Sequence, residues 1–157
     1  MGLVEVEIAA EPPDSEAASE LLERYYAELD TRFPGGFDPD RAVAVAPAEL
    51  LAPRGAFLVA RIGGHPLGCG SVRKLDEATS EIKRMWIDPV ARGRGLGRSL
   101  LAALEAKAIE FGCRSIRLDT NAHLTEAVGL YRSSGYLEVP AYNDNPYAAH
   151  WFEKSLT

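Results

Sequence analysis

The sequence predicts a single α/β (α+β) domain over residues 1–157, with a mixed, mostly antiparallel sheet of six to seven strands flanked by about four helices. A chain of 157 residues is long enough for one buried core and short for two. Two strand-like runs joined at Gly63-Gly64 indicate an antiparallel hairpin. A strand, a glycine-rich loop, a helix and a further strand follow one another between residues 79 and 120, which adds one parallel strand pair.

The N-terminal third is predicted to form a strand and then a long helix. Residues 3–8 alternate apolar and acidic side chains, the period of a half-buried strand, and Pro12-Pro13 ends it. Asp14 or Ser15 can cap a helix that runs to about Phe33, because apolar residues recur there at helical spacing. Residues 34–36 are Pro-Gly-Gly and must break this helix. A short second helix is expected at residues 48–51.

The central strands are predicted at residues 56–62, 66–74 and 79–87. The first two form the hairpin, and the third has an irregular period. Ile82 and Met85 are three residues apart, whereas Met85 and Ile87 are two apart. A bulge near Lys83 or Arg84 would bring all three apolar side chains to one face of the sheet.

The C-terminal elements follow from a change of period. Apolar residues at helical spacing predict a helix from about residue 96 to Gly112. Residues 115–120 then alternate as a strand, parallel to residues 79–87. A short helix at residues 125–134 stops at Gly135, and residues 136–139 and 148–154 are expected to form a last strand pair.

Composition excludes several classes of protein. A net charge of −6 would be repelled by nucleic acid. Cys69 and Cys113 are the two cysteines, and without closely spaced Cys/His ligands we expect reduced structural thiols and no metal. No apolar run approaches the roughly 20 residues of a membrane helix, and the acidic N-terminus lacks a signal-peptide pattern. We therefore expect a cytoplasmic protein without a membrane partner.

Positive charge and glycine come together at one place, between a predicted strand and a predicted helix. This stretch consists of Arg92, Gly93, Arg94, Gly95, Leu96, Gly97 and Arg98. Glycine lets backbone N–H groups turn toward one point, the helix N-terminus adds partial positive charge, and arginine adds charge-assisted hydrogen bonds. The stretch therefore predicts a phosphate site, with a tight strand-to-helix turn as the alternative. We call residues 92–97 the arginine-glycine loop.

Two other phosphate-binding motifs fit this loop less well. A nucleoside triphosphatase loop needs Gly-Lys followed by Ser or Thr, and an earlier glycine that is missing here. The dinucleotide fingerprint needs G-x-G-x-x-G, whereas these glycines run G-x-G-x-G. Asp119 would sit about where a ribose-binding acid belongs, but the strand before the loop is polar and bulged, unlike a buried central strand. NAD or nucleotide binding is thus the less favoured reading.

Four segments together resemble one known family. They are residues 81–89 (EIKRMWIDP), 92–97 (RGRGLG), 116–121 (IRLDTN) and 127–136 (AVGLYRSSGY). In this order and spacing they are similar to the Gcn5-related N-acetyltransferases (GNAT), over about residues 79–136. The resemblance implies a GNAT-like fold in which the bulged central strand splays from its parallel neighbour.

The resemblance also implies acetyl-CoA as cosubstrate and no metal. Backbone groups of the splayed strand, at Met85, Trp86 and Ile87, would hold the thioester and the pantetheine arm. The N–H groups of the arginine-glycine loop would bind the pyrophosphate, with Arg98 close by. Asn121 resembles the side chain that contacts the pantetheine arm.

Direct transfer of the acetyl group needs a neutral amine as nucleophile. A free lysine amine has a pKa of about 10.4, so a base must help at neutral pH. Glu81 resembles the general base of some family members, acting through water, although a solvated strand carboxylate is the alternative; Asp119 is the second candidate. Tyr131 resembles the acid that protonates the departing thiolate, with a core aromatic as the alternative.

The acceptor side is predicted only in outline. In this family the first helix, the loop after it and the last hairpin usually wall the acceptor pocket. The resemblance points to Tyr25, Tyr26, Asp30, Arg32 and Phe33, to the loop at residues 34–38 and to residues 142–147. Within this set, the residues predicted to bind substrate are Tyr25, Asp30, Phe33, Tyr142 and Asn143. Acidic groups there would suit a cationic amine, and Arg32 would suit one that carries a carboxylate. The acceptor is therefore expected to be a primary amine of a small molecule or a peptide.

The main alternative to an enzyme is a non-catalytic module that senses acyl-CoA. The presence of both Glu81 and Tyr131 argues against it. Because family members often form dimers, a homodimer is open as well.

Overall fold

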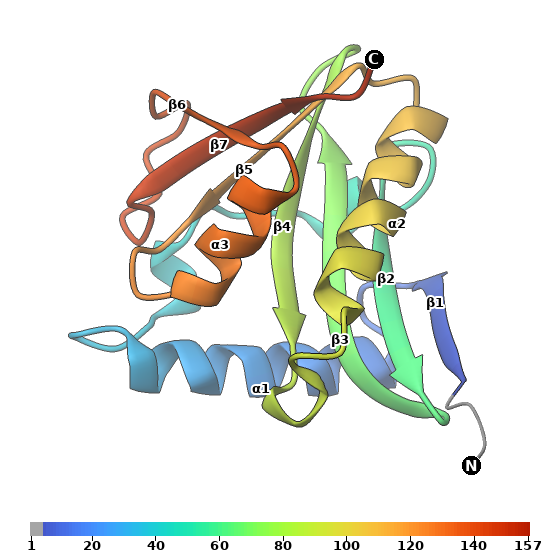
Figure 1. Cartoon of the computed structure of the whole chain (residues 1–157), viewed down its shortest axis with the longest axis vertical. Coiled ribbons are helices and arrows are strands. Elements are labelled where there is room, and N and C mark those ends of the chain that lie inside the picture. Colours follow the sequence, from blue (N-terminus) through green and yellow to red (C-terminus); the bar gives the residue numbers. More distant parts are fainter. Residues whose placement is uncertain (1–4) are drawn as a thin grey trace.

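The computed structural model describes residues 5–157, which form one seven-stranded sheet with helices on both faces (Figure 1). The strands are β1 (Val6–Glu11), β2 (Gly55–Ile62), β3 (His65–Lys74), β4 (Thr79–Ile87), β5 (Ser115–Thr120), β6 (Leu137–Val139) and β7 (His150–Ser155). The α-helices are α1 (Glu16–Arg32), α2 (Leu96–Glu110) and α3 (Thr125–Ser133). Short 3-10 turns occur at η1 (Pro39–Arg41), η2 (Pro47–Leu50) and η3 (Pro89–Ala91).

The predicted fold class is confirmed. The strand order is β1-β2-β3-β4-β5-β7-β6, and β4 with β5 is the parallel pair among antiparallel neighbours. The fourth helical segment, expected at residues 48–51, is the 3-10 turn η2 rather than an α-helix. Residues 3 and 4 of the predicted first strand lie outside the described residues, and β1 continues past residue 8 to Glu11.

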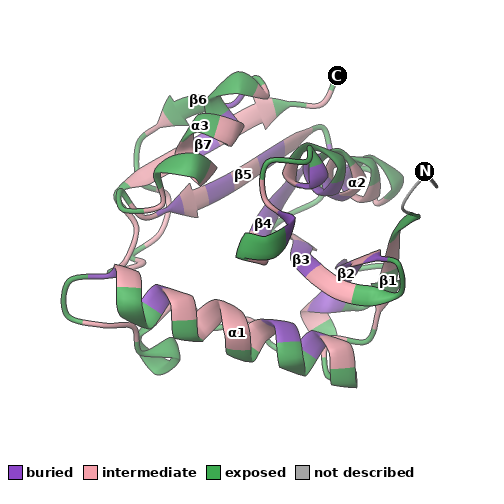
Figure 2. Cartoon of the chain, turned by 60° about the horizontal axis from the view of Figure 1, so that its bottom comes forward, coloured by how far each residue is buried: buried purple, intermediate pink, exposed green. Residues whose placement is uncertain are grey.

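The two faces of the sheet pack in different apolar clusters, as alternation along the first half of β2 shows. Ala56 and Leu58 pack in a cluster with α2, α3 and the C-terminal strands. Phe57 and Val59, the alternate residues, pack in a second cluster with α1 and η2. In Figure 2, α1 accordingly lies on the opposite side of the sheet from α2. Burying both faces explains why β2 is apolar along nearly its whole length.

Helix α1 begins where the sequence predicts. The Ser15 hydroxyl caps it by accepting a hydrogen bond from the Ala18 N–H at 3.1 Å, which satisfies one of the unpaired donors of the first turn. Ala18, Leu21 and Leu29 form its buried stripe. The helix ends at Arg32, just before the Pro-Gly-Gly segment.

The predicted bulge in β4 is present and lies at Arg84. Cys69 pairs with Trp86 and Ser71 with Lys83, so two residues of β4 stand opposite one residue of β3. Arg84 takes a φ of 57°, a left-handed conformation that is strained for a residue with a side chain. The extra residue shifts the period, and Ile82, Met85 and Ile87 all pack toward the α2 face.

Side chains of β3 stabilise the bulge because they donate hydrogen bonds to β4 carbonyl groups where the regular ladder is interrupted. The buried Ser71 hydroxyl donates to the Lys83 carbonyl at 2.7 Å, and the Cys69 thiol approaches the Arg84 carbonyl at 3.4 Å. Buried carbonyl groups left without a donor would cost stability. The bulge is therefore a built feature of the sheet.

Strand β4 stays paired with β5 for only three residues. Thr79, Ser80 and Glu81 pair with residues 115–117, and no pairing between the two strands continues beyond them in the described chain. Strand β5 instead remains paired with β7 as far as Thr120. The second half of β4 thus separates from β5, which leaves the edge of that half facing β5 without a strand partner.

We expect Gly55→Ala to lower the free energy of unfolding by about 2 kcal/mol or more, because the new methyl group would press on backbone atoms that cannot move aside easily. A Cβ at Gly55 would meet the carbonyl oxygens of Glu49 and Val72, the latter at 2.5 Å. Gly129→Ala is the control, because a Cβ there meets nothing within 4 Å and alanine favours the α3 helix. Urea unfolding measures both; equal stability of the two variants would contradict this packing.

Candidate active site

One pocket lies between the end of β4, the arginine-glycine loop and α3, and we call it the loop pocket. It has a volume of about 270 Å³. Residues of every one of these elements line it, among them Met85, Trp86, Ile87, Arg92, Gly93, Gly95, Leu96, Gly97, Arg98, Leu130 and Tyr131. Of the eleven residues predicted for the cofactor, Met85 to Ile87 and all of the loop stretch except Arg94 are therefore together. The N-terminus of α2, at Gly95 to Gly97, contributes to the lining of this pocket.

The backbone of the arginine-glycine loop has the conformation that a phosphate site needs. Gly93 and Gly95 have φ of 80° and 79°, a region that glycine enters without strain. A Cβ at either position would point into open space, so nothing fills the concave side of the loop. Gly95 caps α2 without a side-chain hydrogen bond, which leaves N–H groups of the first turn available to an anion.

The three arginines of this stretch have different surroundings. The Arg92 guanidinium donates to both carboxylate oxygens of Glu28, at 2.7 and 2.8 Å, and to the Ile87 carbonyl at 3.0 Å. Its charge is thus already paired, and the expectation that its side chain helps to hold phosphate is not supported. Arg94 is exposed and lines a different small pocket beside β1. Arg98 lines the loop pocket and bonds the Ser133 hydroxyl at 2.8 Å.

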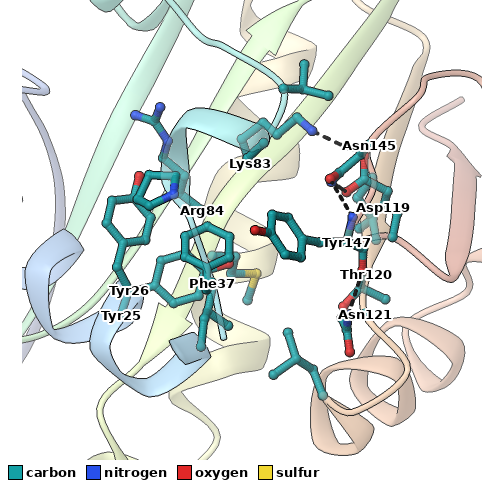
Figure 3. Close-up of a pocket in the computed structure, with 18 of the residues that line it drawn as sticks. Tyr25, Tyr26, Phe37, Lys83, Arg84, Asp119, Thr120, Asn121, Asn145 and Tyr147 are labelled. Atoms are coloured by element: carbon teal, nitrogen blue, oxygen red, sulfur yellow. Dashed lines mark hydrogen bonds and ion pairs between the residues drawn. The ribbon is translucent and has the colours of Figure 1, made fainter. Parts of the chain in front are cut away.

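A second, larger cavity of about 410 Å³ lies on the other side of Met85, and we call it the aromatic pocket (Figure 3). Its aromatic lining residues are Tyr25, Tyr26, Phe33, Phe37, Tyr131 and Tyr147. Its polar lining residues include Asp40, Lys83, Arg84, Asp119, Asn121 and Asn145. Figure 3 shows Tyr25, Tyr26 and Arg84 on one side, and Asp119, Thr120, Asn121 and Asn145 on the opposite side.

The two pockets adjoin along residues that line both, which are Tyr25, Leu29, Met85, Leu124, Ala127 and Tyr131. Met85 and Tyr131 also contact each other there. Tyr131 is 6% exposed, and its hydroxyl lies 3.8 Å from the Met85 sulfur. Burial raises the pKa of Tyr131 well above the ordinary value, so its hydroxyl keeps its proton at neutral pH. A protonated hydroxyl at this junction can donate a proton to a group that arrives through the loop pocket.

Glu81 does not lie in solvent, and the solvated alternative for this residue is wrong. It is 1% exposed and forms an ion pair with Arg73 at 3.0 Å. The Tyr142 hydroxyl donates to its other carboxylate oxygen at 2.7 Å, and the Lys83 ammonium is 3.6 Å away. Glu81 is not among the residues that line either pocket.

Asp119 is the carboxylate that lines the aromatic pocket near Tyr131. Its oxygens accept hydrogen bonds from Lys83 at 3.1 Å, from Asn143 at 2.7 Å and from Asn145 at 2.9 Å. These three donors fix the orientation of the carboxylate.

The predicted acceptor residues divide into two groups. Tyr25 and Phe33 line the aromatic pocket. Asp30 lies outside its lining, because the carboxylate accepts the Phe37 N–H at 2.9 Å and shapes the loop after α1. Tyr142 and Asn143 also lie outside the lining. Tyr142 donates a hydrogen bond to Glu81, and Asn143 donates one to Asp119.

Asn121 lies in the aromatic pocket rather than in the loop pocket. Its amide donates to the Tyr147 carbonyl at 2.6 Å and its oxygen accepts the His123 N–H at 2.8 Å. Both ends of the amide therefore hold local loops. Arg32 is engaged as well, with Glu28, Glu126 and the His123 carbonyl, so it has no free charge for a carboxylate.

A model of the GNAT acetyltransferase family matches residues 18–136 of the chain. The fold and the positions of the site residues agree with this match. The chain belongs to the GNAT acetyltransferase family. It is an acetyl-CoA-dependent N-acetyltransferase. The match includes α1 and β2 to β4 in addition to the segments from β4 to α3 that carry the sequence motifs.

Known GNAT proteins resemble the chain along most of its length. An IAA acetyltransferase from Azospirillum brasilense is 35% identical over 135 residues, which cover 85% of each protein. A GNAT family acetyltransferase from Staphylococcus aureus superposes with a TM-score of 0.79 over 98% of this chain and 100% of the other, at 18% identity. A GNAT family acetyltransferase from Elizabethkingia anophelis, solved with acetyl-CoA bound, has a TM-score of 0.60 at 15% identity over 96% and 97%.

Sequence reasoning placed Phe37 and Tyr147 only within the two segments expected to wall the acceptor pocket, residues 34–38 and 142–147. It did not predict their contact, because their rings come within 4.9 Å, centroid to centroid, only in the folded chain. Arg84 was identified as a bulge residue, but the pattern gave no sign that its side chain lines a pocket.

The described residues also bear on metal ligands, membrane helices and cysteines. Within residues 5–157, no group of three or more His, Cys, Asp or Glu side chains is arranged to hold a metal ion. In the same part of the chain, no helix has the length and apolar character to cross a bilayer. Cys69 and Cys113 are both free and buried.

We expect Glu126→Gln to lose stability at neutral pH and to lose less of it in acid. Hydrogen bonding to Arg32 lowers the pKa of Glu126 from 4.5 to about 2. Because the folded state favours the ionised form, this contribution is present above pH 4.5 and disappears as pH falls toward 2. Glu126 is about half exposed, so the difference at pH 7 should be no more than about 1 kcal/mol.

Urea unfolding at several pH values between 7 and 2.5 measures this difference. Exposed Glu23→Gln is the control and should differ from the parent by a similar small amount at every pH. A Glu126→Gln deficit that stays constant down to pH 2.5 would contradict the assignment.

Proposed function

We propose that this GNAT enzyme transfers the acetyl group of acetyl-CoA directly to a primary amine of a small molecule or a peptide. The observation that carries the proposal is the meeting of the two pockets at Met85 and Tyr131. A thioester that enters through the loop pocket and an amine that enters through the aromatic pocket would come together there. Holding both reactants in one geometry replaces a bimolecular encounter.

The cosubstrate is proposed to lie along the loop pocket. The pyrophosphate would accept hydrogen bonds from N–H groups of the arginine-glycine loop, where Gly93 and Gly95 leave the concave side open. The pantetheine arm would run along the edge of Met85 to Ile87 that faces β5. This edge has no strand partner because β4 leaves β5 after Glu81, although Trp86 and Ile87 stay paired with β3 on the other edge.

The reaction proposed here has no covalent acyl-enzyme. The amine nitrogen attacks the thioester carbon, its extra proton leaves, and the carbon–sulfur bond breaks to give coenzyme A thiolate, which takes a proton from Tyr131. Burial raises the pKa of Cys69 to about 12, which makes that thiol a poor nucleophile. Cys113 is buried as well.

Asp119 is proposed as the group that receives the proton of the amine, directly or through water. It lines the aromatic pocket, whereas Glu81 does not. Glu81 holds Tyr142 and Lys83 in place behind Asp119, and its part in proton transfer through water stays a prediction from the family resemblance. Geometry comes before basicity in such an assignment, because a base must reach the proton.

The rest of the proposal concerns the whole protein. We propose that residues 1–157 act as one acyltransferase domain in the cytoplasm, which suits the two free thiols. A non-catalytic acyl-CoA sensor would not need a protonated tyrosine at the junction of two pockets. A homodimer stays a prediction.

We expect Tyr131→Phe to lower kcat by about 100-fold while acetyl-CoA binds with unchanged affinity, because only the proton for the thiolate is lost. Steady-state thiol release and calorimetric titration measure the two quantities. Tyr136→Phe is the matched control. Its ring contacts Tyr131, but its hydroxyl bonds Glu105 at 2.8 Å, away from both pockets. Equal activity of the two variants would exclude Tyr131 as the acid.

Asp119→Asn should lower kcat/KM for the amine by about 100-fold at pH 7. The deficit should shrink as pH rises toward the pKa of the amine, because more of the amine is then neutral without help. Glu81→Gln should instead lower the free energy of unfolding by about 1 to 3 kcal/mol, since it removes the buried charge that pairs with Arg73 and Lys83, while Arg73 keeps Glu49 as a partner. A large kcat/KM loss in folded Glu81→Gln, with Asp119→Asn active, would reverse the two roles.

A further inference from the structure

Among the described residues on the inner side of the aromatic pocket, every charged side chain but one has a partner of opposite charge. The exception is Arg84. The Lys83 ammonium is 3.1 Å from Asp119. The arginines of α1 and of the arginine-glycine loop that lie nearby are paired too: Arg24 with Asp88, Arg32 with Glu126, and Arg92 with Glu28. Within residues 5–157, the Arg84 guanidinium has no ion pair, hydrogen bond or aromatic ring as partner. It is half-buried and lines the pocket.

The backbone holds Arg84 in place. Its strained φ of 57° and the bonds from Ser71 and Cys69 to neighbouring carbonyls fix the bulge from which its side chain starts. Strained backbone that the surrounding structure over-determines is often found at functional sites. A half-buried guanidinium without a partner, on a fixed stretch of backbone, is suited to bind an anion, and its planar fork matches a carboxylate.

Aromatic rings that contact one another form part of the wall of the same pocket. Tyr26 and Phe37 lie 5.3 Å apart between ring centroids, and Phe37 and Tyr147 lie 4.9 Å apart. Tyr147 is held in this wall because its hydroxyl accepts the Asp38 N–H at 2.8 Å. Flat rings at these distances suit a ligand that is itself flat and apolar on one side. A volume of about 410 Å³ suits a small molecule.

We propose that the acceptor is a primary amine that also carries a carboxylate and an aromatic ring. The carboxylate pairs with Arg84, the ring packs against Tyr26, Phe37 and Tyr147, and the amine faces Tyr131 and Asp119. Asp40, the other unpaired charge in the lining of the described chain, is exposed at the rim, where water screens it. The inference rests on the proposed acetyl transfer for the amine, but the carboxylate site can be tested without turnover.

The turnover test compares acceptors that differ only in the carboxylate. Phenylalanine is paired with phenethylamine, and 3-amino-3-phenylpropanoate with 1-phenylethylamine, so that two carboxylate positions are sampled. We expect the parent to prefer the carboxylate-bearing member of at least one pair by about tenfold or more in kcat/KM, because a site built for a polar group rejects the analogue that lacks it. Arg84→Gln should abolish that preference, measured as the ratio of kcat/KM within each pair. Arg54→Gln, an exposed arginine outside both pockets, should keep it.

The binding test uses 3-phenylpropanoate, a carboxylate without an amine, titrated calorimetrically into the protein saturated with acetyl-CoA. The parent and Arg54→Gln should bind it, and Arg84→Gln should bind it at least tenfold more weakly. Acetylation of plain amines without any carboxylate preference, together with equal binding in parent and Arg84→Gln, would overturn the carboxylate site and leave the proposed function standing. Arg84-dependent binding without acetylation of any amine would support the site and overturn the proposed function.

Discussion

The bulge at Arg84 is the constraint on which the rest of the site depends. One extra residue in β4 turns the second half of that strand away from β5 after only three paired residues. The opening that results is bordered by free backbone on one side and by α3 on the other. Met85, which follows the bulge directly, lines both pockets together with Tyr131.

The elements of the fold could be predicted from sequence because each has a local cause. Ser15 caps α1, Gly63 and Gly64 turn the hairpin, and the broken period of residues 82–87 reveals the bulge. The same is true of the arginine-glycine loop, since a phosphate cradle is made of backbone and needs only glycine at set positions. Tyr131 was predicted from the family motifs, because periodicity alone cannot show that a residue lies where two pockets adjoin.

The functional use of charged side chains could not be predicted, because it depends on partners far away in the sequence. Arg92 stands among glycines, yet Glu28, 64 residues earlier, pairs with it. Glu81 looks like an exposed strand residue, yet Arg73 and Tyr142 cover it. Asp30 and Tyr142 were assigned to the acceptor because they lie in the right segments, but each turns to a neighbour in the fold instead.

The central claim is that the loop pocket and its junction form one acetyl-CoA site. Calorimetric titration with acetyl-CoA, beside NAD and ATP at moderate salt, tests it most directly, since loose attraction to the arginines is screened under those conditions. The account predicts saturable one-to-one binding of acetyl-CoA and at least tenfold weaker binding of the other two. No binding of acetyl-CoA, or equal binding of all three, would contradict it.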